Sequence, residues 1–195
     1  MTTPLTARDR AKAERADALL TEAARLFAAR GYSGVSLEDI GTAVGVSGPA
    51  VYRHFAGKQA LLGAVLVKVS EDLVSGGTRV FSEAATTDDR IRALIDFHVD
   101  FALGNADVIR VHDRDLAHLS DEDRAEVRRL QREYIDLWIA ALTPVHDAPA
   151  DELRLRVQAC FGLINSTPHS TRAASRSKRS TAALLSSMAL AALVA

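Results

Sequence analysis

The chain has very little cysteine: Cys160 is the single one among 195 residues. An intrachain disulfide is therefore excluded, and so is a zinc site built from several thiolates. The sequence also lacks an apolar run at its start, so we expect no secretory signal and, by default, a cytoplasmic location. No membrane span is expected, because the final apolar stretch, residues 182–195, is shorter than the roughly 20 residues that a spanning helix requires.

A marked excess of one charge sign is missing as well. The chain carries 24 Lys and Arg against 25 Asp and Glu, for a formal net charge of −1, which argues against a general binder of polyanions. The charges are unevenly spread, because residues 1–62 carry a small basic excess and the rest a small acidic one. That asymmetry has the sign expected for DNA binding near the N-terminus, but it is too small to identify the function alone.

Strand-like alternation of apolar and polar residues is absent over any useful length, whereas helical spacing recurs throughout. We therefore expect an all-α protein of about nine helices. A three-helix domain is expected over residues 1–57 and a larger helical domain over residues 58–195. The helix that begins near Lys58 is expected to stop at Ser75-Gly76-Gly77, and Thr87 is expected to cap the next one.

The most informative stretch is SLEDIGTAVGVSGPAVYRHFAGKQALL, residues 36–62. Ser36 is followed three residues later by an aspartate, which is typical of a capped helix start. Gly45 can take the left-handed conformation that ends a helix, and Ser47 followed by Pro49 indicates the start of another. Two helices joined by a tight glycine turn form the helix-turn-helix pattern, whose second helix enters the DNA major groove.

These residues resemble the DNA-binding region of TetR/AcrR-family transcriptional regulators. The shared parts are the spacing of the first helix, the GVS turn, the aromatic pair in VYRHF and the K-x-x-L opening of the next helix. The run LLTEAARLFAARGYSGVS resembles the first helix of that family and its exit. The resemblance covers about residues 16–62, and beyond them the layout is only compatible. It implies a C-terminal domain for ligand binding and dimerisation, in which the last two helices pair with those of a second subunit.

The second helix and its flanks supply the DNA-binding residues. Arg53 can bind guanine through two hydrogen bonds, and Ala50 can touch a thymine methyl group. Tyr52 and His54 are expected to contact phosphates. Lys58 is expected to meet a phosphate with help from the positive end of its helix. The expected set is Ser36, Ser47, Gly48, Pro49, Ala50, Tyr52, Arg53, His54 and Lys58.

Two positions depart from the family pattern. The family typically has a basic residue and a hydroxyl residue where this chain has Gly48 and Ala50. Both departures remove hydrogen-bonding side chains from the surface that would face the groove. They keep a second hypothesis open, a helical ligand-binding or scaffold protein whose helix-turn-helix no longer reads DNA.

Aromatic and polar side chains on the C-terminal helices predict a small-molecule pocket, although ordinary core packing explains most of the aromatic ones better. The mainly apolar lining favours a lipophilic effector. The segment FGLINSTPHS faintly resembles regulators that sense acyl-CoA thioesters, whose phosphates would need Arg110, Arg114 or the loop at residues 172–179. The expected ligand-binding residues are Phe97, His98, Phe101, Ile109, His112, Tyr134, Trp138, Phe161 and Asn165.

Other chemistries find less support. His112, Asp115 and His118 recur every three residues, a spacing that can gather metal ligands, but a charged helix surface explains them too. Ser166 and His169 stand at an expected helix end without a G-x-S-x-G motif. We therefore expect no metal, no cofactor and no enzymatic activity.

The sequence as a whole predicts a ligand-responsive transcriptional regulator. We expect a repressor that binds a palindromic operator as a homodimer and is released by a lipophilic small molecule, with acyl-CoA as one option. The homodimer is expected to form through the last two helices, with Phe161 and Leu185 in the interface.

Overall fold

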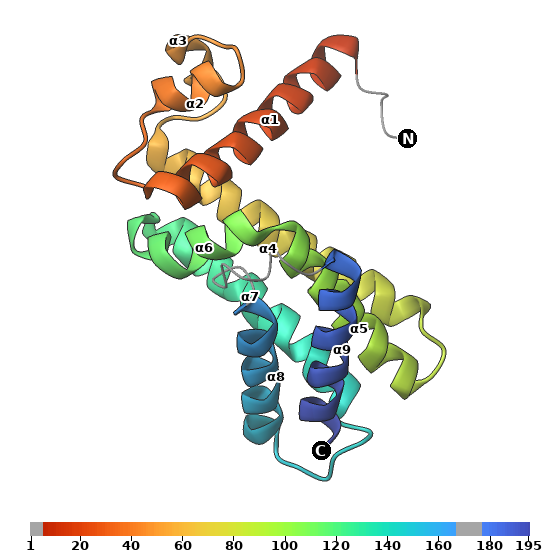
Figure 1. Cartoon of the computed structure of the whole chain (residues 1–195). Coiled ribbons are helices and arrows are strands. Elements are labelled where there is room, and N and C mark those ends of the chain that lie inside the picture. The colour runs from red at the N-terminus through yellow and green to blue at the C-terminus, as the bar shows by residue number, and fades with distance from the viewer. Residues whose placement is uncertain (1–5, 167–176) are drawn as a thin grey trace.

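Figure 1 shows the computed structural model, which describes residues 6–166 and 177–195. Within those residues every regular element is a helix, nine of them α-helices, which confirms the all-α expectation. The bounds are α1 Ala7–Arg30, α2 Leu37–Ala43, α3 Gly48–Val51, α4 Lys58–Glu83, α5 Thr87–Gly104, α6 Ala106–Asp115, the 3-10 helix η1 Leu116–His118, α7 Asp121–Leu142, α8 Ala150–Asn165 and α9 Lys178–Val194.

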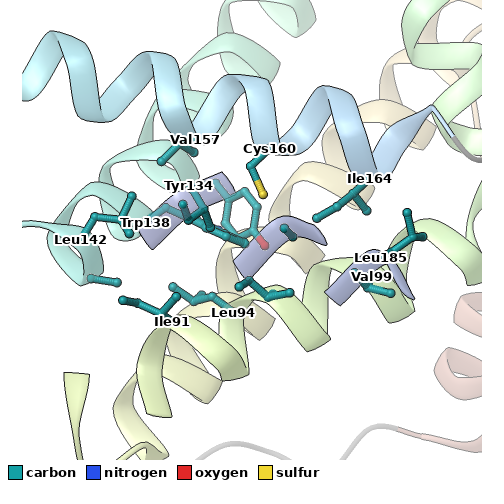
Figure 2. Close-up of a cluster of buried hydrophobic side chains, with 14 of the residues drawn as sticks. Ile91, Leu94, Val99, Tyr134, Trp138, Leu142, Val157, Cys160, Ile164 and Leu185 are labelled. Atoms are coloured by element: carbon teal, nitrogen blue, oxygen red, sulfur yellow. The ribbon is translucent and has the colours of Figure 1, made fainter. Parts of the chain in front are cut away.

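Two clusters of buried side chains hold these helices together. The first joins α1, α2, α3 and the beginning of α4, around Phe27 and Ile40, and it also takes in Val111 from α6. The second joins α5, α7, α8 and α9 around Trp138 and Tyr134 (Figure 2). The long helix α4 contributes to both clusters and runs from the helix-turn-helix end into the body of the molecule (Figure 1). The expected domain boundary therefore falls at the start of a helix that the two parts share.

Local capping sets several helix starts. Ser36 and Asp39 form the expected capping box at α2. A second capping box, not expected from the sequence, begins α1 at Thr6. At α5 the capping residue is Thr86 rather than the expected Thr87, because Asp89 must lie three residues after the cap to bond back to it.

Helix α4 does not stop at Ser75-Gly76-Gly77 as expected, but continues to Glu83. The two glycines make room for aromatic rings of neighbouring helices. A Cβ on Gly76 would lie 2.3 Å from Cζ of Phe97, and a Cβ on Gly77 would lie 2.6 Å from Cε2 of Tyr134. The expectation was wrong because these glycines serve close packing against α5 and α7 rather than helix termination.

Helices α8 and α9 lie side by side at the C-terminal end of the described chain (Figure 1). The His146 ring nitrogen lies 2.6 Å from the Leu193 carbonyl, and Arg156 donates to the Ala195 carbonyl at 2.9 Å, so the end of α9 is tied down. Across the helices described here, none combines the length and the hydropathy that crossing a bilayer demands.

Candidate DNA-binding surface and ligand cavity

The turn between α2 and α3 is built on two glycines. Gly45 has a φ of +72°, which a side chain would strain, and the Val46 amide then donates to the Gly41 carbonyl at 2.8 Å. A Cβ on Gly41 would lie 2.9 Å from the Val46 oxygen and 3.0 Å from Cγ2 of Val51. The two helices can therefore approach closely, with Val51 fully buried between them.

Helix α3 is shorter than the motif suggested. The amides of Arg53 and His54 donate to carbonyls three residues back, at 3.3 and 2.9 Å, so the chain tightens into turns after Val51. Gly48 and Pro49 are poor helix formers, which is consistent with a single regular turn. Ser47 occupies the capping position as expected, but its hydroxyl makes no capping hydrogen bond.

The exposed side of this unit carries most of the expected DNA-binding side chains. Tyr52 is 56% exposed, so its ring and hydroxyl are accessible to a partner outside the protein. The Ser36 hydroxyl is already engaged with the carboxylate of Asp39 at 2.8 Å. Of the expected residues, Ser36, Ser47, Pro49, Tyr52 and Arg53 are exposed, whereas Gly48, Ala50, His54 and Lys58 are half-buried.

Lys58 has a structural role that the sequence did not reveal. Its ammonium donates to the carbonyls of Tyr32 and Val35, both at 2.9 Å, and lies 4.4 Å from the centre of the Tyr32 ring. These contacts tie the start of α4 to the loop that follows α1. Two of the three ammonium hydrogens are thereby used, which leaves one for a phosphate.

A cavity of about 280 Å³ lies among α4, α5, α6, α7 and α8. Its size is near the lower end of ligand pockets, and apolar side chains dominate its wall. Seven of the nine expected ligand-binding residues line it, and Val69, Ser70, Leu73, Val108, Asp113, Leu130, Gln131, Ile135 and Gln158 complete the lining. The seven are His98, Phe101, Ile109, His112, Tyr134, Phe161 and Asn165.

The other two expected residues lie outside the lining. Phe97 packs on Gly76 of α4, and Trp138 is 1% exposed with its ring nearly perpendicular to that of Phe161 at 5.1 Å between centroids. Neither position could be told from the others by spacing, because one helical stripe holds both cavity-facing and core-facing rings. Gln131 was missed, although a polar residue near the apolar stripe of α7 was an available signal.

An aromatic stack fixes the inner wall of the cavity. The His98 ring stacks on Phe161 at 4.4 Å between centroids, and its Nδ1 lies 3.3 Å from the Tyr134 hydroxyl. Burial lowers the pKa of His98 to about 4, so the imidazole is neutral at physiological pH. Burial also raises the pKa of Tyr134, and it raises the pKa of Cys160 to about 12, so both groups keep their protons.

A hydrogen bond between α7 and α6 closes another side of the cavity. The side-chain amide of Gln131 lies 2.5 Å from Nε2 of His112, which joins α7 to α6. Because an amide N–H donates, Nε2 of His112 is the acceptor, and its Nδ1 carries the hydrogen toward Asp113 at 3.5 Å. Any molecule that enters between α6 and α7 must compete with this contact.

The three residues spaced like metal ligands do not converge. His112 bonds Gln131, Asp115 is buried against the guanidinium of Arg114, and the His118 ring stacks on Tyr32 at 4.6 Å. In the part of the chain that the structure describes, no three histidine, cysteine or acidic side chains are grouped to hold a metal ion.

The structure also locates most of the other candidate residues named from the sequence. Ser166 ends α8 and donates to the Leu163 carbonyl at 2.7 Å, while His169 lies outside the described residues. Arg110 pairs with Asp107 at 3.1 Å. Most of the loop at 172–179 lies outside the described residues, and only its end enters α9.

Arg114 connects the cavity wall to the first helix. Its guanidinium donates to the carbonyls of Phe27 and Ala28 in the last turn of α1, and it pairs with Asp115 at 2.9 Å. Cations are favourable at a helix C-terminus, where carbonyls lack partners. Arg114 is therefore engaged within the protein and does not stand at the cavity mouth as a phosphate ligand.

A helix-turn-helix unit joined to a helical domain with an internal cavity defines a class of transcriptional regulators. Residues 19–65 match the family model for bacterial regulatory proteins of the tetR family, and residues 84–169 match the tetracyclin repressor-like C-terminal domain. Together the matches cover about two thirds of the chain. The chain belongs to the TetR family, which is a family of transcriptional regulators rather than of enzymes.

Relatives and solved structures agree with the family. The chain is 35% identical over 88 residues to the transcriptional activator FasR of Mycolicibacterium smegmatis, which is 45% of this chain and 40% of FasR. It is 24% identical over 132 residues to the transcriptional repressor KstR2 of Rhodococcus jostii, which is 67% of this chain and 65% of KstR2. The chain thus spans less than two thirds of either relative. The structure of AibR, solved with isovaleryl coenzyme A and operator DNA, shares the fold with a TM-score of 0.75 at 20% identity, covering 89% of this chain and 97% of AibR.

Proposed function

We propose that this regulator is a homodimeric repressor whose operator binding is relieved by a lipophilic acyl compound in the cavity. One observation carries the proposal: both α4 and α6 line the cavity and both grip the chain around the end of α1. A molecule between these helices changes their spacing and therefore acts on the helix-turn-helix unit directly.

The DNA-docking surface of the proposal is the exposed side of α3 and its following turn. Tyr52 and Arg53 are exposed there, and the Arg53 guanidinium makes no hydrogen bond to the described residues. We assign Arg53 to a base edge and Tyr52 to a phosphate. A single short helix reads too few bases for a specific site, so two units are needed, and two-fold symmetry predicts half-sites about 34–36 Å apart or a multiple of that.

The dimer surface of the proposal is the outer side of α8 and α9. Leu155, Leu184 and Met188 are 65%, 46% and 47% exposed on these helices, an apolar surface that association would cover. The interface residues named from the sequence are less suitable, because Leu185 is buried within the protomer and Phe161 lines the cavity.

The effector class follows from the size and chemistry of the cavity. A volume of about 280 Å³ admits a short or medium acyl group but no nucleotide. The nucleotide of an acyl-CoA would therefore lie outside, and Gln131 also borders an adjoining hollow lined by Arg124 and Arg128. We assign the phosphates to the exposed Arg128, since Arg114 is engaged with α1. The fold similarity to AibR, which was solved with isovaleryl coenzyme A, supports this class.

Whether the ligand releases or promotes DNA binding depends on which conformation of the regulator it binds more tightly. Ligand releases DNA only if it prefers the conformation that does not bind the operator, and a preference of about 100-fold corresponds to roughly 2.7 kcal/mol per site. Operator DNA must then weaken ligand binding by the same factor. The relatives include an activator, FasR, and a repressor, KstR2, and we propose the repressor for this chain.

Fluorescence anisotropy with DNA from upstream of the chain's own gene tests the proposal. Acyl-CoAs and free lipids are titrated into the protein–DNA complex, with small hydrophilic metabolites as controls. We expect release by acyl compounds and reciprocal weakening of acyl binding by DNA. Release by the hydrophilic metabolites alone would contradict the acyl assignment.

A second candidate function rests on Gly48 and Ala50, which bring no hydrogen-bonding side chain to the docking surface. A helical ligand-binding protein whose helix-turn-helix no longer reads DNA would have that feature. The dependence of DNA affinity on salt separates the two: a steep slope and a preference for one sequence support the regulator. A flat slope with intact ligand binding supports the second candidate.

A further inference from the structure

Two buried polar atoms beside the cavity have no hydrogen-bond partner among residues 6–166 and 177–195. They are Nε2 of His98 and Oδ1 of Asn165, and both residues line the cavity. His98 is 2% exposed, so solvent around the protein does not reach its ring freely. Such atoms are uncommon in folded proteins because an unsatisfied buried donor or acceptor is destabilising.

The surroundings of His98 define which nitrogen carries the hydrogen. The imidazole is neutral and has a single N–H, and its Nδ1 lies 3.3 Å from the Tyr134 hydroxyl. Burial raises the pKa of Tyr134, so its hydroxyl keeps its hydrogen, and Nδ1 of His98 is the acceptor that the described residues place within reach of it. The phenol therefore gives its hydrogen to Nδ1, which leaves Nε2 of His98 as a donor.

The two unpartnered atoms are therefore a donor and an acceptor close to each other. A side-chain interaction with Asn165 raises the pKa of His98 against the larger effect of burial, which places the amide near the imidazole, but Nε2 and Oδ1 do not reach the distance and angle of a formed hydrogen bond. A hydroxyl group combines the two functions that these atoms lack, because its oxygen accepts and its hydrogen donates.

We propose that the cavity recognises a hydroxyl group on the effector, which accepts from Nε2–H of His98 and donates to Oδ1 of Asn165. This inference rests on the proposed function and narrows its effector class from acyl compounds to hydroxylated acyl compounds. A carbonyl serves only His98, an ammonium serves only Asn165, and a methylene serves neither. A carboxylate accepts from His98 but is repelled by the amide oxygen.

The rest of the wall suits the hydrocarbon part of such a molecule. Phe101, Ile109, Leu130 and Ile135 contribute apolar surface to the same cavity. The Phe161 stack and the Tyr134 hydrogen bond hold the imidazole in one orientation, so little side-chain freedom remains to be lost on binding. A site organised in this way discriminates against a ligand that lacks the hydroxyl, because the polar atoms then stay unpaired.

Matched ligand pairs test the inference by isothermal titration calorimetry. Each pair is a 3-hydroxyacyl-CoA and the plain acyl-CoA of equal chain length. We expect the wild-type protein to bind the hydroxylated member about ten-fold more tightly, or more. His98→Phe, which keeps a ring against Phe161, and Asn165→Leu should both lose this preference and still bind the plain member. His146→Phe, a histidine remote from the cavity, is the control that keeps it.

A second arm separates the hydroxyl inference from the acyl-CoA assignment. Hexanol and hexanethiol have similar shapes, but the thiol is a weak hydrogen-bonding group. Ligand-induced shifts in the thermal unfolding midpoint should favour the alcohol in the wild-type protein and not in His98→Phe. If no acyl-CoA binds while this difference persists, the effector class is wrong and the hydroxyl inference is supported.

Two results would overturn the inference. Equal binding of both members in the acyl-CoA pairs and in the alcohol–thiol pair would mean that solvent or direct pairing serves the two atoms as well as a ligand does. A hydroxyl preference that survives in both His98→Phe and Asn165→Leu would place the recognition elsewhere. Circular dichroism of each variant confirms that the helices are retained.

Discussion

Gly77→Ala puts a methyl group where the ring of Tyr134 lies, and its effect on stability can be worked out from the structure. The new Cβ would be 2.6 Å from Cε2 of that ring. Tyr134 cannot easily withdraw, because it is buried, with ring centroids 5.5 Å from Phe161 and 5.7 Å from His98. The substitution therefore overpacks the wall of the cavity.

Two opposing contributions set the magnitude. Replacing a glycine in the interior of a helix by alanine stabilises it by about 0.5–1 kcal/mol, because the unfolded chain loses freedom. Overpacking a well-packed core costs about 1–3 kcal/mol. We expect a net destabilisation of about 1–2 kcal/mol for Gly77→Ala. Gly76→Ala should cost less, because the ring it meets belongs to the half-buried Phe97, which can rotate outward.

Urea unfolding followed by circular dichroism measures the difference, at one protein concentration because association would shift the midpoint. Gly104→Ala is the control: apart from its chain neighbours and the backbone of its own helix, no atom of the described residues lies within 4 Å of its added Cβ, so it should be neutral or slightly stabilising. Stabilisation of Gly77→Ala by the amount expected for an open helical site would refute the close approach of α4 and α7.

Three further predictions concern DNA, the dimer and pH. Arg53→Ala should weaken operator binding by about 1–3 kcal/mol and relax the preference at one base pair, as measured by anisotropy on operator variants; unchanged affinity would contradict the docking side. Met188→Glu should yield a folded monomer in sedimentation, because this side chain is 47% exposed in the protomer, whereas a stable dimer would move the interface away from α9. The folded-state pKa of His98, about 4, lies below its unfolded value of 6.5, so stability should fall by about 3 kcal/mol as the pH drops from 6.5 toward 4. His98→Phe should lack this part of the pH dependence in urea unfolding. Identical pH profiles for the wild-type protein and His98→Phe would disprove the assignment of this dependence to His98.

Features that depend on neighbouring residues could be predicted from the sequence. The cap at Ser36, the glycine turn at Gly45 and the buried position of Val51 all lie within one short stretch, and each is set by local geometry. The same holds for the number of helices among the described residues, because helical spacing and caps repeat along the sequence. Local rules are sufficient where the partner of a residue is a few positions away.

Features that depend on distant partners could not be predicted in the same way. Gly76 and Gly77 look like a helix end in sequence, and only the rings of Phe97 and Tyr134 explain why the helix continues through them. For the aromatic residues, the sequence likewise could not separate those that line the cavity from those that pack in the core. Trp138 is one turn from the cavity-lining Tyr134 on α7, yet it packs in the core, because the cavity occupies only part of the stripe that the helix buries.

Lys58 and Arg114 show what the distant partners add to function. The sequence suggests a DNA phosphate contact for Lys58, because it begins a helix, and offers Arg114 as one of the candidates for the phosphates of an acyl-CoA. In the structure, Lys58 from α4 holds the carbonyls of Tyr32 and Val35, while Arg114 from α6 holds those of the last turn of α1. Two cations, on two helices that both line the cavity, thus hold one short segment, residues 27–35. A ligand that separates α4 from α6 cannot leave the hydrogen bonds of both Lys58 and Arg114 unchanged. We therefore expect the end of α1, and the helix-turn-helix unit attached to it, to move with one of these two helices and to lose its contact with the other.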